Sequence, residues 1–400
     1  MSLEDRWLLP EGIDELLPPQ AMRLESLRRR LLDLFQSWGY ELVIPPLIEY
    51  LESLLTGMGH DLELQTFKIT DQLTGRLMGI RADMTPQAAR IDARLKHNAP
   101  TRLCYLGPVL HTLPNGFDRS RNPFQVGAEL YGHRGIESDA EVILLMLESL
   151  RLTGIAAVWL DLGHMGVFRG LARQAGLNPE QQGIVFDILQ RKAQPELETY
   201  LKDARIAPWV MDMFIALMDL NGDAAILERA RCVLAPACPE VQQALDELAN
   251  IAHLVQARTS EKNHFHFDLA ELRGYHYHTG VMFAAYIPGY GQALARGGRY
   301  DDIGRVFGRA RPATGFSTDL KTLVSLQPFA FEPAGRVYAP WPSDPQLAAV
   351  IERLRKAGNH VICALPGQPG GSLELRCNKR LERQGEQWVV VDRVEPEFLE

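Results

Sequence analysis

Residues 124–130 read FQVGAEL and alternate between apolar and polar or small side chains along their whole length. Successive side chains of a β-strand point to opposite faces, so this spacing predicts a strand with one buried face. The face expected in the core carries Phe124, Val126, Ala128 and Leu130. The opposite face carries Gln125, Gly127 and Glu129. We therefore expect a strand that presents an amide and a carboxylate on its other side.

Two other stretches place polar side chains at every second position. They contain Arg81, Asp83 and Thr85, and Arg273, Tyr275 and Tyr277. The solvent-facing side of an antiparallel sheet would explain any one of these sets alone. Together, however, they suit a zwitterion, because carboxylates bind an ammonium group and arginine binds a carboxylate. The residues thus predict a pocket for a small amphoteric ligand.

The composition indicates a multidomain globular protein, since 400 residues suffice for two or three domains and 46% of them are hydrophobic. The N-terminus lacks the features of a secretory signal, and no run of apolar residues is long enough to span a membrane. Five cysteines without a CxxC pair indicate reduced thiols, so we expect a cytoplasmic protein. The net charge of -8 disfavours a nucleic-acid partner, because phosphate neutralisation dominates that affinity.

The patterns predict an α+β chain with four segments. Residues 1–164 and 259–328 form two parts of one core, rich in short strands. Residues 165–258 have helical spacing broken by turns, which predicts a helical insertion. A loose stretch near residues 326–335 separates a small C-terminal α/β domain, residues 329–400.

Local signals predict individual elements. Leucine spacing indicates a helix over residues 22–38, and Ser138 with Glu141 forms a capping box for a helix that runs to about Thr153. Residues 64–132 are expected to be mostly antiparallel strands. Further strands are expected at 157–162, 263–269, 280–287, 337–339, 360–365 and 388–391, and helices at 344–356 and from Thr318 onward.

The sequence gives little support for a phosphate loop or a metal site. Neither GxxxxGK[ST] nor GxGxxG occurs, and Gly289 to Gly291 has the composition of a hairpin turn. His264, His266 and Asp268 would share one strand face, but no second cluster accompanies them. We therefore expect neither a metal nor another cofactor.

Four motifs resemble the core of histidyl-tRNA synthetases, and they occur in the order of that family. They are RADMT at 81–85, QVGAE at 125–129, LRGYHYHTG at 272–280 and GGRYD at 297–301. The resemblance covers residues 8 to about 325. It implies a class II aminoacyl-tRNA synthetase-like fold, in which an antiparallel sheet is flanked by helices and carries a helical insertion.

The resemblance also implies roles for the polar residues. Positions matching Asp83, Thr85, Gln125 and Glu129 hold the backbone groups and ring of histidine in that family, and matches to Arg273 and Tyr277 complete the site. Tyr275 lies on the same period and is included in the predicted pocket. Asp83 stands where the family commonly has glutamate, and His278 stands where a second tyrosine is usual.

The phosphate-binding arginines of that family have no match here. Its motif 2, Phe-Arg-x-Glu, aligns with Leu110 to Leu113, and its motif 3, Gly-x-Glu-Arg, aligns with Asp319 to Thr322. His111 and Thr322 thus replace arginines, each of which would contribute about 1.5–3 kcal/mol through charge-assisted contacts. We expect adenylation to be slower by several orders of magnitude, and hence no catalytic residues. Arg119 and Arg121 remain nearby, either as a weak nucleotide site or as a solvated basic loop.

The C-terminal segment looks too short for the anticodon-binding domain of a synthetase. A synthetase-like chain of this length without the arginines resembles the regulatory subunits of the short-form ATP phosphoribosyltransferase, which opens histidine biosynthesis. That resemblance implies a non-catalytic subunit in a hetero-octamer with a short catalytic subunit, with histidine as feedback effector. Homodimerisation is expected around residues 40–49. An active adenylating synthetase and a synthetase-like tRNA sensor remain the alternatives.

Overall fold

The computed structural model describes residues 7–55, 60–114, 120–155, 157–259, 263–270, 278–326 and 335–392. The chain divides into two compact units, Met1–Phe329 and Ala330–Glu400, and each is described by itself. Among the described residues, none of the helices combines the length and apolar character needed to cross a membrane.

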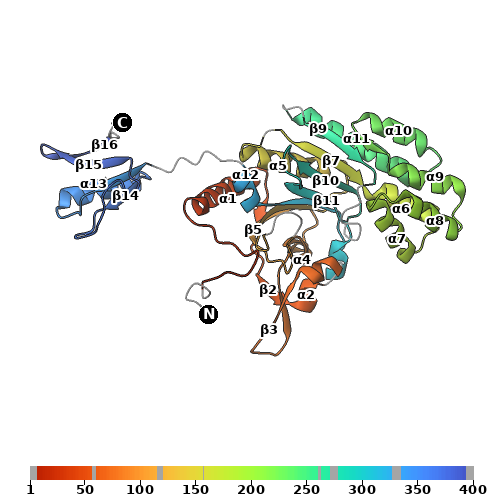
Figure 1. Cartoon of the computed structure of the whole chain (residues 1–400), viewed down its shortest axis with the longest axis horizontal. Helices are drawn as coiled ribbons and strands as arrows, with labels where there is room; N and C mark the ends of the chain where they lie inside the picture. The colour runs from red at the N-terminus through yellow and green to blue at the C-terminus, as the bar shows by residue number, and fades with distance from the viewer. Residues whose placement is uncertain are drawn as a thin grey trace. The chain divides into compact units, whose positions relative to one another are not determined.

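A nine-stranded sheet forms the centre of the first unit (Figure 1). Its order is β1 (Glu41–Leu42), β5 (Thr101–Pro108), β6 (Phe124–Tyr131), β12 (Ala313–Asp319), β11 (Ala295–Arg299), β10 (Val281–Tyr286), β7 (Trp159–His164), β9 (His264–Asp268) and β8 (Asn221–Gly222). The pairs are antiparallel except β1 with β5 and β7 with β9. The predicted α+β class with an antiparallel central sheet is confirmed.

Helices cover one face of this sheet. They are α1 (Gln20–Ser37), α5 (Ile136–Leu152), α11 (Pro239–Arg258) and α12 (Leu320–Leu326). The predicted inward residues Val126, Ala128 and Leu130 are buried there, and the Phe35 ring lies edge-on to that of Phe316 at 6.2 Å. Gln125 and Glu129 therefore point to the other face of the sheet, where the candidate site lies.

The predicted strand at residues 81–85 is wrong. Arg81 to Met84 connect β4 (Leu77–Ile80) to α4 (Thr85–Leu95), so Thr85 begins a helix. Pro86 fits this first turn because proline lacks the N–H that a helix start leaves unpaired anyway. β4 itself pairs with β2 (Ile48–Tyr50) and β3 (Phe67–Thr70) in a separate small sheet, beside α2 (Leu51–Leu55) and α3 (His60–Gln65).

The middle of the chain is helical, as its periodicity predicts. Its elements before α11 are α6 (Met165–Gln174), α7 (Pro179–Gln190), α8 (Gln194–Asp203), α9 (Pro208–Leu217) and α10 (Ala225–Val233). α7 begins with a full capping box formed by Asn178 and Gln181. α11 packs against both α5 and α6, so these helices share one core with the sheet.

The predicted capping box of α5 is wrong. The helix begins at Ile136, and Ser138 lies in its first turn, where its Oγ donates to the carbonyl of Gly135 at 2.7 Å. The same Oγ accepts from Arg299 at 2.9 Å. Ser138 is thus engaged in a buried network rather than in capping a backbone N–H.

Within its described residues, 335–392, the second unit contains a four-stranded sheet and one helix. The sheet order is β14 (His360–Cys363), β13 (Arg336–Ala339), β15 (Lys379–Gln384) and β16 (Gln387–Asp392), and the helix is α13 (Pro345–Lys356). Val337, Leu347 and Ile351 form its core together with Leu381. β15 was not predicted, because Leu381 is the single apolar residue in its sequence KRLERQ.

Candidate ligand-binding site

Glu129 lies in the middle of β6 with only 1% of its surface exposed. The hydroxyl of Tyr105 donates to its Oε1 at 2.8 Å, and the hydroxyl of Tyr300 donates to its Oε2. Burial raises the pKa of Glu129 well above its usual value, while the hydrogen bond from Tyr105 acts in the opposite direction. A ligand that donates a hydrogen bond or brings a positive charge would therefore be favoured beside it.

The other polar groups of the predicted pocket join Glu129 in one network. The Thr85 hydroxyl lies 2.9 Å from that of Tyr105, and it must donate because Tyr105 gives its own proton to Glu129. Asp83 Oδ1 accepts from the backbone N–H of Thr85 at 3.0 Å and from Gln125 Nε2 at 2.7 Å. Asp83, Thr85, Gln125 and Glu129 are thus brought together, although Asp83 and Thr85 arrive from a turn and a helix start.

Arg273, Tyr275 and Tyr277 lie outside the described residues, so their placement in the pocket stays a prediction. Tyr105 and Tyr300 were not predicted as pocket residues. Tyr300 could have been found, because it belongs to the GGRYD motif at residues 297–301. Tyr105 is opposite Gly127 across β5 and β6, and its role follows only from that register.

Two glycines leave room for the network. A Cβ on Gly127 would overlap the Tyr105 ring and hydroxyl, and a Cβ on Gly315 would overlap Glu129 Oε2. Gly315 is paired with Glu129 across β12 and β6. The buried carboxylate therefore depends on a missing side chain on the neighbouring strand.

We expect Gly315→Ala to weaken the fold by about 1–3 kcal/mol, the usual cost of overpacking a buried site, because the new methyl must displace Glu129. Urea unfolding at pH 7 measures this loss. Gly183→Ala is the matched control, since a Cβ there meets no atom within 4 Å and alanine favours the α7 helix. Equal stability of the two variants would contradict the close approach at residue 315.

A cavity of about 240 Å³ adjoins this network, because Gln125 contributes to both. Its wall includes His111, Ser120, Arg296, Asp319 and Thr322. The positions that match the phosphate-binding arginines of synthetases, His111 and Thr322, therefore face one common space. The chemistry of that space decides whether a nucleotide can be held beside the pocket.

At both positions, the side chain donates a hydrogen bond to another group of the protein. His111 is buried, and its Nε2 donates to the carbonyl of Ala82 at 2.9 Å. Thr322 Oγ1 donates to Asp319 Oδ2 at 2.8 Å. Asp319 caps α12 and also accepts from the backbone N–H of Phe124 at 2.8 Å, while burial raises its pKa. The Thr322 hydroxyl is thus bonded to a buried carboxyl group, and neither residue supplies positive charge to the cavity.

Two of the nearby cations, Arg121 and Lys321, have protein partners, whereas the exposed Arg296 lines the cavity. Arg121 donates through Nε to the carbonyl of His111 and through Nη1 to that of Glu11, both at 3.0 Å. Lys321 Nζ lies 3.1 Å from each carboxylate oxygen of Asp14. Arg119 lies outside the described residues. Arg121 is therefore a structural tie in this structure rather than a solvated side chain.

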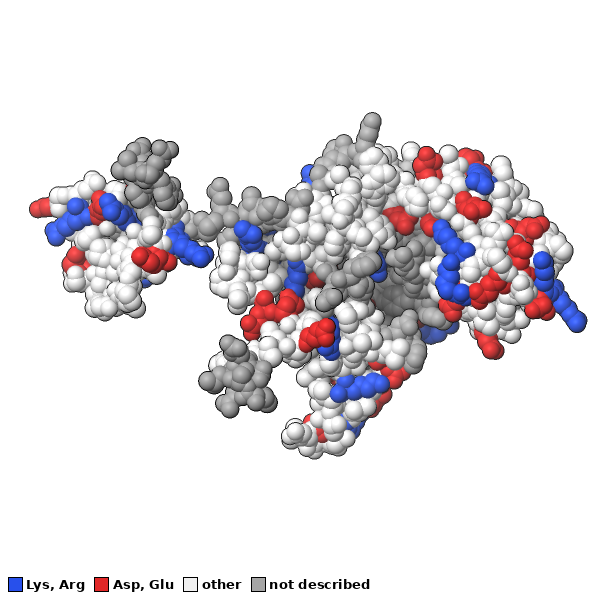
Figure 2. Space-filling view, viewed as in Figure 1, with Lys and Arg blue, Asp and Glu red and all other residues white. Residues whose placement is uncertain are grey.

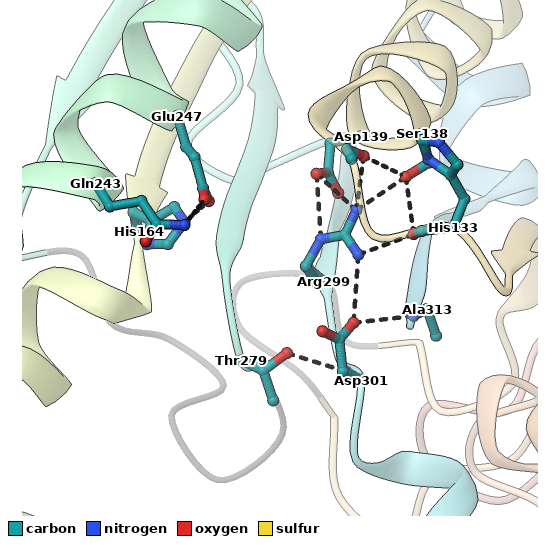
Figure 3. A network of polar contacts seen from close by, with 11 residues as sticks. His133, Ser138, Asp139, His164, Gln243, Glu247, Thr279, Arg299, Asp301 and Ala313 are labelled. Carbon is teal, nitrogen blue, oxygen red and sulfur yellow. Dashed lines mark hydrogen bonds and ion pairs between the residues drawn. The ribbon is translucent and has the colours of Figure 1, made fainter. Parts of the chain in front are cut away.

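A buried arginine, Arg299, joins Ser138, Asp139 and Asp301 in a polar network next to the pocket residue Tyr300 in the sequence (Figure 3). Arg299 immediately precedes Tyr300, and its Nη2 donates to Asp139 Oδ2 at 2.8 Å. Their side chains are 8% and 3% exposed, so the ion pair is almost fully desolvated. Further bonds reach the carbonyl of His133 at 3.2 Å and Asp301 Oδ1 at 3.3 Å. Arg299 thereby ties β11 to the start of α5.

The spaced histidines of β9, His264 and His266, make protein contacts. His266 Nδ1 lies 2.7 Å from Asp161 Oδ1, and the ring of His264 stacks on Trp159 at 4.6 Å. Within the ranges that the structure describes, no group of three or more His, Cys, Asp or Glu side chains could hold a metal ion.

Two protein-family models match the chain. The model described as histidyl-tRNA synthetase matches residues 12–323. The model described as ATP phosphoribosyltransferase subunit HisZ C-terminal domain matches residues 334–391. Together the two matches account for both compact units.

Known proteins similar to the chain share its full length. An ATP phosphoribosyltransferase regulatory subunit of Thioalkalivibrio sulfidiphilus is 59% identical, covering 98% of this chain and 100% of the relative. Its counterpart from Pseudomonas syringae pv. tomato is 54% identical, covering 98% and 99%.

Solved structures support the fold. A protein from Bacillus halodurans, described as an ATP phosphoribosyltransferase regulatory subunit/histidyl-tRNA synthetase, has a TM-score of 0.78 at 24% identity and covers 92% of this chain and 96% of its own. Histidyl-tRNA synthetase from Nostoc sp. PCC 7120 has a TM-score of 0.77 at 18% identity and covers 96% and 97%. At these identities the likeness concerns the fold alone.

Proposed function

The chain belongs to the ATP phosphoribosyltransferase regulatory subunits, and we propose that its pocket binds histidine as the effector of the assembly. As a regulatory subunit it is non-catalytic, and its family implies a separate catalytic subunit as partner. The observation that carries the proposal is the buried Glu129, which two tyrosine hydroxyls hold in the sheet beside Asp83 and Gln125. Carboxylates at both ends of the network suit the imidazole N–H and the α-ammonium of histidine.

The adjoining cavity supports binding without adenylation. His111 and Thr322 replace the two arginines, and Lys321 is paired with Asp14. Adenylation needs preorganised, positively charged protein groups that contact the phosphates of ATP. Each missing group of this kind typically lowers the rate a hundredfold or more. Histidine would then bind as a signal and leave unchanged.

We extend the proposal to a homodimer within a hetero-octamer. β1 is an edge strand of the large sheet, and the apolar side chains beside it are exposed. Ile44 is 83% exposed and Leu42 is 46% exposed. Exposed apolar patches of this kind support an interface, here between residues 40–49 of two copies.

A tRNA sensor is less well supported. The net charge is -8, and Lys and Arg side chains are interspersed with Asp and Glu on the helical region in the view of Figure 2. A nucleic-acid surface depends on clustered positive charge. This mixed surface favours the regulatory function.

Reconstitution tests the proposal. The chain is mixed with the short catalytic subunit, phosphoribosyl transfer from phosphoribosyl pyrophosphate to ATP is measured, and histidine is then titrated. We expect transfer that depends on the chain and declines with histidine. Histidine-dependent exchange of pyrophosphate into ATP by the pure chain would instead indicate an active adenylating enzyme.

A further inference from the structure

The N-terminal segment, defined as residues 10–14, is bonded to the loop that precedes β6. The backbone N–H of Arg121 donates to the carbonyl of Gly12 at 2.6 Å. Asn122 Nδ2 donates to the carbonyl of Asp14 at 2.9 Å, and the N–H of Asp14 donates back to Asn122 Oδ1 at 3.3 Å. These bonds join residues more than a hundred positions apart, so they hold the segment against the loop that precedes β6.

Asp14 is the residue of this segment whose carboxylate reaches Lys321 and Ser120. Its carboxylate accepts from Lys321 Nζ at 3.1 Å and from Ser120 Oγ at 3.2 Å. Asp14, Ser120, Lys321 and Thr322 line a second cavity of about 410 Å³. This cavity shares Ser120, Asp319 and Thr322 with the cavity of about 240 Å³ beside Gln125.

Stability alone does not account for the pair. The Asp14 side chain is 46% exposed, and ion pairs with an exposed partner contribute little to the free energy of unfolding. The Lys321 side chain is only 15% exposed, so its charge is screened less by solvent than an ordinary surface lysine. The main electrostatic effect of Asp14 is therefore to neutralise the cation next to residue 322.

We propose that Asp14 is a specificity determinant that excludes polyanionic ligands from the two cavities beside the histidine pocket. The idea rests on the proposed function, because it concerns which ligands reach that pocket. The lost arginines remove attraction for phosphates, whereas Asp14 adds repulsion and occupies Lys321. Discrimination commonly needs such a repulsive element as well as a missing attractive one.

The test uses the full-length chain and inorganic tripolyphosphate, titrated by calorimetry at low ionic strength. Asp14→Asn keeps a hydrogen-bonding side chain for Ser120 but frees the charge of Lys321. We expect Asp14→Asn to bind tripolyphosphate about tenfold more tightly than the parent chain. Adding Lys321→Gln to Asp14→Asn is expected to abolish the gain.

Glu15→Gln is the matched control. It makes the same change of charge one position away, and among the described residues Glu15 has no hydrogen bond or ion pair. An equal gain in Glu15→Gln, or unchanged affinity in Asp14→Asn, would overturn the proposal. Histidine titrations of the same proteins report separately on the proposed function, since a failure to bind histidine leaves the tripolyphosphate comparison intact.

Discussion

Arg299→Met is expected to destabilise the chain by about 3–5 kcal/mol at pH 7. The substitution keeps most of the buried volume but leaves the carboxylate of Asp139, 3% exposed, without its cation. Removing one partner of a desolvated ion pair carries this cost because the remaining charge is buried and uncompensated. Urea unfolding followed by circular dichroism measures the difference.

The pH dependence of this variant has a defined sign. Burial already raises the pKa of Asp139, and the Arg299 charge opposes that rise. Without the arginine the folded-state pKa of Asp139 must rise further, so protonation favours the folded form. The stability gap between variant and parent should therefore narrow as the pH falls below that raised pKa.

Two further variants separate the ion pair from general damage. Arg299→Met with Asp139→Leu should recover much of the loss, because an apolar pair often replaces a buried ion pair without net cost. Arg305→Met is the surface control, since Arg305 and Asp302 are 74% and 58% exposed and such pairs contribute little. An equal loss in Arg305→Met would contradict the special role of Arg299.

Much of the large sheet could be predicted from the sequence, because its strands carry a strong local signal. In β6 the alternation from Phe124 to Leu130 coincides with a strand, but residues 126–131 are buried on both faces rather than on one. The helix over residues 22–38 was equally clear, and α1 (Gln20–Ser37) confirms it. In both elements, the apolar residues that recur at the expected period also pack in the core.

The remaining features depend on contacts that no local pattern encodes. The spacing of Arg81, Asp83 and Thr85 imitates a strand, yet the chain turns there and Pro86 opens a helix. The same residues still converge on the pocket, so their chemistry was a better guide than their period.

Strand register and long-range pairing could not be predicted from the sequence either. Gly315 makes room for Glu129 because β12 and β6 pair in one register, and a shift of one residue would remove that match. Asp14 and Lys321 are separated by 307 positions, so their ion pair follows only from the folded chain.

Glu129→Gln is expected to weaken histidine binding about a hundredfold, the upper part of the range for losing a hydrogen bond to a charged group. Glutamine preserves the volume and can still accept from one of Tyr105 and Tyr300, but it cannot supply the negative charge. Calorimetric titration of the chain with histidine measures the affinity, and the reconstituted complex should lose inhibition over the same concentration range.

Although Glu129→Gln should weaken histidine binding, it should not lower the free energy of unfolding. Because the folded-state pKa of Glu129 is raised, its contribution to stability is complete below its ordinary pKa and is lost as the pH rises through the raised value. Glutamine has no proton to lose, so Glu129→Gln should be at least as stable as the parent chain at neutral pH. Weaker binding together with retained stability separates a ligand contact from a merely structural residue.

Glu141→Gln provides the matched control, because Glu141 also accepts from a tyrosine, Tyr40, at 3.1 Å, and pairs with Arg102 at 2.7 Å. Glu141 lies on α5, which covers the opposite face of the sheet, so its loss should lower stability and leave histidine affinity unchanged. If Glu129→Gln binds histidine as tightly as the parent chain, the effector must bind elsewhere, and the buried carboxylate is then only a costly element of the fold.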